Sequence, residues 1–352
     1  MRAFTDQFGF EPGATARAPG RVNLLGDHTD YNEGFVLPTA IAQATTVGVS
    51  EALDGFHDFY SVQLRTRARF RDGGAPPSGF ADYVHGCIEM LRRRDVKIGA
   101  LTLCIDSDVP VGAGLSSSAA LEVATLRALR ELYGFTLDDV ALASLAQQAE
   151  IQFAHVNCGI MDQMASSLGS TDCMLFLDTR SLETRRLPLP AGSEILIVDS
   201  NVPRTLAGSG YNERRAQCEE AAGLLGVRAL RDITDADATT GLPKPLDARA
   251  RHVVSEDNRV LHAAQGVDAR QFGELMNASH ASLRDDYQVS VPEVDYLVAQ
   301  LQAQPQVFGA RMTGAGFGGA CVALIERGTR DAVCASALRG YLGEHGREAT
   351  VY

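Results

Sequence analysis

A glycine-rich turn between a strand and a helix is the feature that most constrains this chain. Residues 109–120 read V-P-V-G-A-G-L-S-S-S-A-A. Residues 101–105 alternate apolar and polar side chains, which predicts a half-buried strand, and residues 116–133 predict a helix that ends at Gly134. Glycines let successive N–H groups point into one concavity, and a helix N-terminus adds partial positive charge. The turn therefore predicts a phosphate-binding loop, since three serines after two glycines exceed what a plain helix cap requires.

Lysine is nearly absent, which removes two common ways of handling ATP. Lys97 and Lys244 are the only lysines among the 32 lysine and arginine residues. Lys97 precedes an isoleucine and Lys244 lies between two prolines, so neither completes a P-loop, which needs Lys directly before Ser or Thr. Neither stands on the V-A-I-K strand that carries the protein-kinase lysine. If this chain binds ATP, it therefore uses another kind of site.

The composition predicts a globular protein of one large domain or two. The 352 residues are 45% hydrophobic and 22% charged, which supplies enough apolar material for a core. A net charge of -12 disfavours binding to nucleic acid or to anionic membranes. Seven scattered cysteines without C-x-x-C predict reduced thiols rather than disulfides or a zinc site. With no signal-peptide pattern and no membrane-length apolar run, we expect a cytoplasmic protein.

The order of elements predicts an α+β fold with a domain boundary between residues 170 and 200. Thr136 and Asp139 resemble a capping box that opens a helix running to about His155. Further helices are expected near 210–225, 247–264, 268–284, 292–303 and 329–342. Further strands are expected at 173–178, 194–199, 306–312 and 320–326, and surface loops at 72–79 and 242–246.

A second glycine cluster lies at residues 314–319. It matches G-x-G-x-x-G by letter, but the following residues 320–325 predict a strand where a dinucleotide-binding fingerprint needs a helix. Two interpretations stay open, a tight hairpin turn or a backbone segment that lines an active site.

Two polar segments are candidates for chemistry. Residues 21–32 place an arginine, two aspartates, a histidine and asparagine around glycine, which suits a polyhydroxylated ligand, although spacing alone slightly favours a solvated loop. His28 has no histidine partner at helical spacing, so a metal site there is not expected. Asp162 stands among apolar residues, as a partly desolvated catalytic carboxylate often does, although taken alone it would rather be read as a helix cap.

Taken together, these segments resemble the galactokinase family of the small-metabolite kinase superfamily. The resemblance runs from residue 20 to about residue 325 and rests on five segments besides the glycine-rich turn, at 20–38, 159–163, 209–215, 282–287 and 311–319. It implies a two-domain kinase with mixed sheets flanked by helices and an active site between the domains. Residues 1–180 would hold the sugar signature, the phosphate loop and the catalytic aspartate. Residues 181–352 would hold helices, a ferredoxin-like sheet and the glycine-rich loop 314–319.

The resemblance also implies roles for individual residues. Asp162 would be the base that faces the anomeric hydroxyl of the sugar, and Arg21 would stabilise charge beside it. The implied sugar-binding residues are Asp27, His28, Thr29, Asp30, Gly159 and Tyr211. The implied ATP-binding residues are Ser61, Gly112, Ala113, Gly114, Leu115, Ser116, Ser117 and Ser118. Ser118 and Glu150 would hold Mg²⁺.

The implied activity is ATP-dependent phosphorylation of α-D-galactose to galactose 1-phosphate, the first committed step of galactose catabolism. The implied partners are small molecules, and we expect a monomer or weak homo-oligomer. Asp27 stands where the family usually has Glu, and Ala315 and Ala320 replace the usual Gly and Cys. The resemblance implies that the acid at this position meets a hydroxyl at the far end of the sugar. The shorter Asp27 therefore leaves open a relative that phosphorylates arabinose, an amino-sugar or a uronic acid. A sugar and ATP sensor without activity is the other alternative, although Asp162, Arg21 and the serines argue against it.

Overall fold

The chain folds into two compact units that do not follow one another along the sequence. The computed structural model describes residues 1–203 and 207–352. Unit 1 comprises Met1–Arg21, Ala40–Pro110 and Ser116–Gly169, and unit 2 comprises Val22–Thr39, Val111–Leu115 and Ser170–Tyr352. The main break at Gly169 falls near the predicted boundary region. Two short early segments nevertheless belong to unit 2, a discontinuity that the predicted division at residue 180 does not contain.

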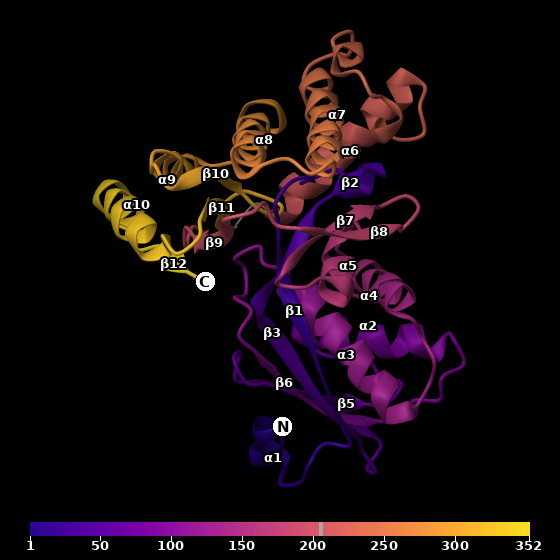
Figure 1. Ribbon diagram of the computed structural model, residues 1–352. Coiled ribbons are helices and arrows are strands. Elements are labelled where there is room, and N and C mark those ends of the chain that lie inside the picture. The colour runs from indigo at the N-terminus through magenta and orange to yellow at the C-terminus, as the bar shows by residue number, and fades with distance from the viewer. Residues whose placement is uncertain (204–206) are drawn as a thin grey trace. The chain divides into compact units, whose positions relative to one another are not determined.

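Unit 1 is built on a five-stranded sheet with the order β1-β3-β6-β4-β5. Its strands are β1 (Ala14–Asn23), β3 (Pro38–Glu51), β4 (Phe56–Ser61), β5 (Thr66–Arg71) and β6 (Leu101–Ser107). Its helices are α1 (Arg2–Phe8), α2 (Phe80–Arg92), α3 (Ser117–Tyr133), α4 (Asp139–Phe153) and α5 (Met161–Leu168). Helices α2 to α5 pack on one another and cover one face of the sheet (Figure 1). The sheet is mixed, since β4 pairs with β6 in parallel while β3 pairs with β6 in antiparallel.

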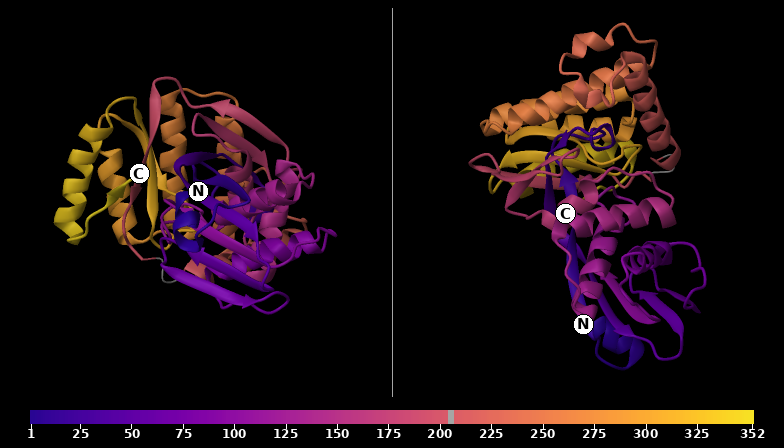
Figure 2. Two further views of the ribbon diagram at one scale, coloured as in Figure 1. Left: turned by 90° about the horizontal axis from the view of Figure 1, so that it is seen from below. Right: turned by 90° about the vertical axis from the view of Figure 1, so that its right-hand side faces the viewer.

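Unit 2 contains an antiparallel sheet with the order β10-β11-β9-β12 and a smaller sheet with the order β2-β7-β8. The strands are β2 (Phe35–Val36), β7 (Cys173–Asp178), β8 (Thr184–Pro188), β9 (Ser193–Asp199), β10 (Val307–Met312), β11 (Ala320–Glu326) and β12 (Thr350–Val351). The helices are α6 (Ala207–Leu225), α7 (Leu246–Ala263), α8 (Ala269–Ser282), α9 (Pro292–Gln302) and α10 (Arg330–His345), with short turns at Asp30–Asn32, Leu230–Asp232, Ala236–Thr239 and Leu283–Tyr287. Helices α8 and α9 pack on β10, and Figure 2 shows this helical layer on one face of the strands.

Most predicted elements are confirmed, and two local predictions are wrong. Strand β6 is not half-buried, because Thr102 and Cys104 are buried as fully as their apolar neighbours. The reason is α1, which packs against β6 and covers the second face of the strand. Helix α4 is not capped by Thr136, since Asp138 is the N-cap and its carboxylate accepts from the Ala141 amide at 2.8 Å. The predicted loops at 72–79 and 242–246 are confirmed, although the last residue of the second already begins α7.

No helix in the described part of the chain is both long and apolar enough to span a membrane.

Candidate active site

The Asp162 carboxylate is held between a cation and a hydroxyl in unit 1. Arg21, near the end of β1, donates its Nε to Asp162 Oδ1 at 2.8 Å and brings its Nη2 to 2.6 Å from the same oxygen. Ser116 donates its hydroxyl to Asp162 Oδ2 at 2.6 Å. The Arg21 side chain is 5% exposed and that of Asp162 is 28% exposed, so the carboxylate is the accessible member of the pair. Asp162 lies in the first turn of α5, where Ile160 is the N-cap, so the cap interpretation of Asp162 is wrong.

The glycine-rich turn has the backbone that its sequence predicts. Gly112 and Gly114 both adopt φ of 83°, and Ser116 occupies the left-handed region with φ of 60° directly before α3. In unit 2 the second glycine cluster lies beside this turn, because the Ala320 amide donates to the Ala113 carbonyl at 3.0 Å. The cluster 314–319 is thus a hairpin turn between β10 and β11 and also supports the first glycine loop. The hairpin interpretation is confirmed, and the lining of an active site stays a prediction.

Two buried glutamates, Glu122 on α3 and Glu150 on α4, contact the first turn of α5. Gln163 donates its Nε2 to Glu150 Oε2 at 2.6 Å and to Glu122 Oε2 at 3.2 Å. Burial raises the pKa of Glu150 to about 7, with the Asp162 charge adding to the shift and a Ser118 hydrogen bond opposing it. Burial also raises the pKa of Glu122 well above its usual value. Glu122 Oε1 has no hydrogen-bond partner among the described residues. Two carboxyl groups at one buried place form a site that a divalent cation would compensate.

All of residues 21–32 except Asp30 and Tyr31 are buried, so the solvated-loop interpretation of this segment is wrong. Asp27 is 1% exposed, and its carboxylate accepts from Asn23 Nδ2 at 2.9 Å and from Arg311. His28 is 4% exposed and adopts φ of 66°. The partners that bury the segment come from residues far along the chain, such as Arg311. Spacing within the segment therefore carries no sign of them.

His28 lies in an aromatic cluster in unit 2. Its Nδ1 is 2.8 Å from the Tyr31 hydroxyl, which is 2.6 Å from the Tyr287 hydroxyl. The Tyr211 ring, from α6, lies 5.7 Å from the His28 ring. Burial lowers the pKa of His28 well below its usual value, so the imidazole is neutral at physiological pH. A hydrogen bond to the Ala315 backbone opposes this shift in the pKa of His28.

The remaining predicted residues have varied surroundings. Thr29 is fully buried, and its hydroxyl donates to the Gly26 and Phe35 carbonyls, so it stabilises its own turn. Asp30 is partly exposed and accepts from the Tyr31 amide. Gly159 is buried in unit 1, directly before the N-cap of α5. Ser61 ends β4, where its hydroxyl accepts from the Leu64 amide. The predicted binding roles of these residues stay predictions.

Sequence reasoning missed four polar residues that support the candidate site. Asn23 and Arg311 bind the Asp27 carboxylate, while Gln163 and Glu122 contact Glu150. Asn23 and Gln163 lie inside segments that the sequence analysis singled out. Their short distance along the sequence from Asp27 and Asp162 could therefore have indicated them. Glu122 falls among apolar residues on the buried α3, where a charged residue is unusual. Arg311 likewise opens the segment 311–319, but its pairing with Asp27 carries no sequence signal, since Asp27 stands 284 positions earlier.

Asp257 on α7 binds the hairpin that follows the buried segment. Its Oδ1 accepts from the Phe35 amide at 2.7 Å, and its carboxyl group fills the space where a side chain on Gly34 would stand. Burial raises the pKa of Asp257 from 3.8 to about 8. The folded protein therefore binds this proton more tightly than the unfolded chain. The contribution of Asp257 to stability is complete below pH 3.8 and is lost as the pH rises through about 8.

We expect Asp257→Asn to become more stable than the parent as the pH rises. Asparagine keeps an oxygen for the Phe35 amide but has no proton to lose. The difference in unfolding free energy should grow by up to about 1.4 kcal/mol per pH unit and level off above about pH 8. Denaturant unfolding of both proteins at pH 6, 7, 8 and 9 measures this difference. Subtracting the parent value cancels the contributions of other groups that titrate in this range. Parallel profiles for the two proteins would contradict the burial argument.

Comparisons with known proteins give the family. The model of the GHMP kinases N terminal domain matches residues 82–170, and that of the GHMP kinases C terminal matches residues 260–342. The galactokinase galactose-binding signature matches residues 2–51. Galactokinase from Roseiflexus sp. (strain RS-1) is 43% identical over 99% of this chain and 93% of its own length. That from Chloroflexus aurantiacus is 45% identical over 98% of this chain and 92% of its own length.

Solved structures agree with these matches. The crystal structure of Lactococcus lactis galactokinase complexed with galactose has a TM-score of 0.94 and 35% identity, covering 100% of this chain and 95% of that one. The mevalonate kinase of Methanococcus jannaschii has a TM-score of 0.70 at 17% identity, covering 98% of both chains, and shares the fold. The fold is therefore that of a GHMP kinase, a phosphotransferase that acts on an alcohol group. Within that class, the chain belongs to the galactokinase family.

Proposed function

We propose that this protein transfers the γ-phosphoryl group of ATP to the anomeric hydroxyl of α-D-galactose, giving ADP and galactose 1-phosphate. The observation that carries the proposal is the accessible Asp162 carboxylate, fixed by Arg21 and Ser116 at the start of α3. Family membership supports galactose as the acceptor. Under this proposal the partners are small molecules, and Asp27, His28, Asp30, Gly159 and Tyr211 bind the sugar.

Asp162 accepts the proton that the anomeric hydroxyl loses. A well-placed general base contributes about 10²- to 10⁴-fold to the rate. Arg21, whose guanidinium contacts the same carboxylate, supplies positive charge for the transferring phosphoryl group. Since phosphoryl transfer requires chiefly positioning and charge stabilisation, the N–H groups of the glycine-rich turn and the start of α3 hold the ATP phosphates. No lysine is needed in this arrangement.

Ser118 and Glu150 are the residues that would hold Mg²⁺. The described residues contain no group of three metal-ligating His, Cys, Asp or Glu side chains, so other oxygen ligands would have to join these two residues. The unpartnered Glu122 oxygen and the buried Glu150 support a cation here, because a positive charge would offset two buried carboxyl groups. When bound, Mg²⁺ would neutralise charge on the ATP phosphates.

Asp27 is the one observation that favours another sugar. The test is kcat/KM over galactose, arabinose, an amino-sugar and a uronic acid, measured as ADP release. We expect galactose to be the best substrate. Another sugar in that place would favour the related sugar kinase, and no turnover with any sugar would favour the sensor.

Asp27→Glu tests the fit of the shorter acid. The position is 1% exposed and already filled by its contacts with Asn23 and Arg311, so an added methylene should overpack it. We expect kcat/KM for galactose to fall by about 5-fold or more, chiefly through KM. A gain in kcat/KM for galactose would instead indicate that Asp27 adapts the site to a different sugar.

A further inference from the structure

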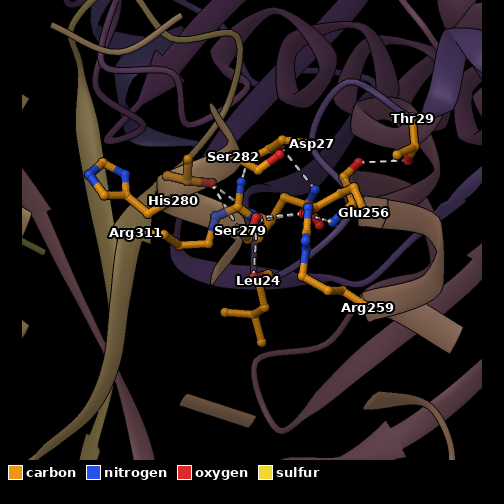
Figure 3. A network of polar contacts seen from close by, with 12 residues as sticks. Leu24, Asp27, Thr29, Glu256, Arg259, Ser279, His280, Ser282 and Arg311 are labelled. Atoms are coloured by element: carbon orange, nitrogen blue, oxygen red, sulfur yellow. Dashed lines mark hydrogen bonds and ion pairs between the residues drawn. The ribbon is translucent and has the colours of Figure 1, made fainter. Parts of the chain in front are cut away.

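A network of charged side chains in unit 2 surrounds the Asp27 carboxylate and contains Arg311, Glu256 and Arg259 (Figure 3). Arg311 on β10 is fully buried and contacts the Asp27 carboxylate through Nη2. Its Nη1 donates to the Leu24 carbonyl at 3.1 Å and lies 3.5 Å from Glu256 Oε1. One guanidinium thus binds the backbone before Asp27 and the carboxylate of Asp27 itself.

Glu256 on α7 binds the same segment from another direction. Its Oε1 accepts from the Gly26 amide at 2.8 Å and from the Ser279 hydroxyl at 2.6 Å. Its Oε2 accepts from Arg259 Nε at 2.6 Å. Burial opposes the ionised form of Glu256, but the Arg259 and Arg311 charges prevail and hold its pKa far below the usual range. The two cations therefore balance the two carboxylates, which makes the burial of Asp27, Glu256 and Arg311 tolerable.

Three backbone groups of the segment Leu24–Asp27 are consequently held by buried side chains of unit 2. Arg311 binds the Leu24 carbonyl, Glu256 the Gly26 amide and His252 Nε2 the Asp27 carbonyl at 3.1 Å. Polar groups set by buried, charge-assisted bonds have little freedom to move. An arginine fork is also geometrically selective for a carboxylate in a way that a lysine ammonium is not.

The geometry points to Arg311, supported by Glu256, as a positioning and specificity-determining residue that fixes the Asp27 carboxylate as the acceptor for a sugar hydroxyl. This inference rests on the proposed function and on the expectation that Asp27 meets a hydroxyl at the far end of the sugar. A fixed acceptor discriminates between sugars, because a sugar that lacks the hydroxyl forgoes a charge-assisted hydrogen bond to Asp27. Sugars that end in a hydroxymethyl group should therefore be preferred over those that lack its hydroxyl.

The test compares kcat/KM for galactose with kcat/KM for 6-deoxygalactose in the full-length protein. This ratio does not depend on the fraction of active enzyme, so it is insensitive to a merely structural loss. We expect the parent to favour galactose by about 10-fold or more, and Arg311→Lys to lower the ratio by most of that factor through KM for galactose. KM for ATP should stay within about 2-fold.

Arg259→Lys is the matched control, because Arg259 donates to Glu256 and to Ser255, which both lie with it on α7. We expect it to keep the parental sugar ratio whatever it costs in stability. Asp27→Asn keeps the volume of the side chain and serves if Arg311→Lys does not fold. It should lower the ratio to a similar level, and the double variant should lower it no further.

The outcomes separate this inference from the proposed function. A parent that phosphorylates no sugar overturns the proposed function. A parent that uses galactose but does not distinguish it from 6-deoxygalactose overturns the inference alone. The inference also fails if Arg311→Lys, or Asp27→Asn in its place, keeps the parental ratio, or if Arg259→Lys lowers the ratio equally.

Discussion

Replacing Asp162 with Asn is expected to leave the protein folded and to lower kcat by about 10²- to 10⁴-fold, the usual contribution of a general base. Asparagine has the same shape and offers an oxygen to Arg21, but it cannot take the proton from the sugar hydroxyl. Since other groups would hold the ATP phosphates under the proposed function, KM for ATP should change little. Steady-state kinetics with galactose, together with circular dichroism and the unfolding midpoint, measures both parts of this expectation.

Asp139→Asn is the matched control for Asp162→Asn. Both aspartates lie in the first turn of a helix in unit 1, and both pair with an arginine, which for Asp139 is Arg130 at 3.0 Å. Both substitutions remove a favourable charge near a helix N-terminus, at a cost of about 0.3–1 kcal/mol. Only Asp162→Asn should abolish turnover. An Asp162→Asn enzyme with near-parental kcat, or an Asp139→Asn enzyme equally impaired, would refute the assignment of the base.

Much of the local structure follows from the sequence because short-range physics determines it. The helix at 117–133 is predicted from its apolar pattern and from Gly134, which ends it with φ of 66°. The phosphate loop is predicted because its glycines and serines are adjacent. Where two short-range signals compete, the prediction is less certain, and α4 accordingly begins from Asp138 rather than from Thr136.

The site itself depends on contacts between distant residues. Arg21 meets Asp162 across 141 positions, and Asp27 meets Arg311 across 284. When each segment is taken alone, the sequence therefore favours a solvated loop for Asp27 and a helix cap for Asp162. Resemblance to a family supplied the pairing of Arg21 with Asp162 that spacing could not. Arg311 opens the segment 311–319 that carries part of the resemblance, but neither spacing nor resemblance indicated its contact with Glu256. Glu256 lies on α7, outside every motif.

The contact between α8 and β10 is the place where one added methyl group should cost most in stability. A side chain carbon on Gly273 would lie 2.0 Å from the Phe308 carbonyl oxygen and 2.8 Å from the Gly309 amide nitrogen. Both are backbone atoms of β10, so neither can turn away, and α8 must separate from the strand. We expect Gly273→Ala to lower the free energy of unfolding by about 3 kcal/mol or more.

Gly223→Ala is the control, because Gly223 is also a helical glycine but has no atom within 4 Å of the added carbon. Alanine favours a helix over glycine by up to about 1 kcal/mol, so this variant should gain slightly in stability. If the close approach of α8 and β10 is real, denaturant unfolding should show a lower free energy of unfolding for Gly273→Ala and a higher one for Gly223→Ala. Equal changes in the two variants would refute it. Because Arg311 stands two residues after Gly309 on β10, the folded fraction of Gly273→Ala should also show a raised KM for galactose. That result would show that the packing of β10 affects both the stability of unit 2 and the position of the Asp27 carboxylate.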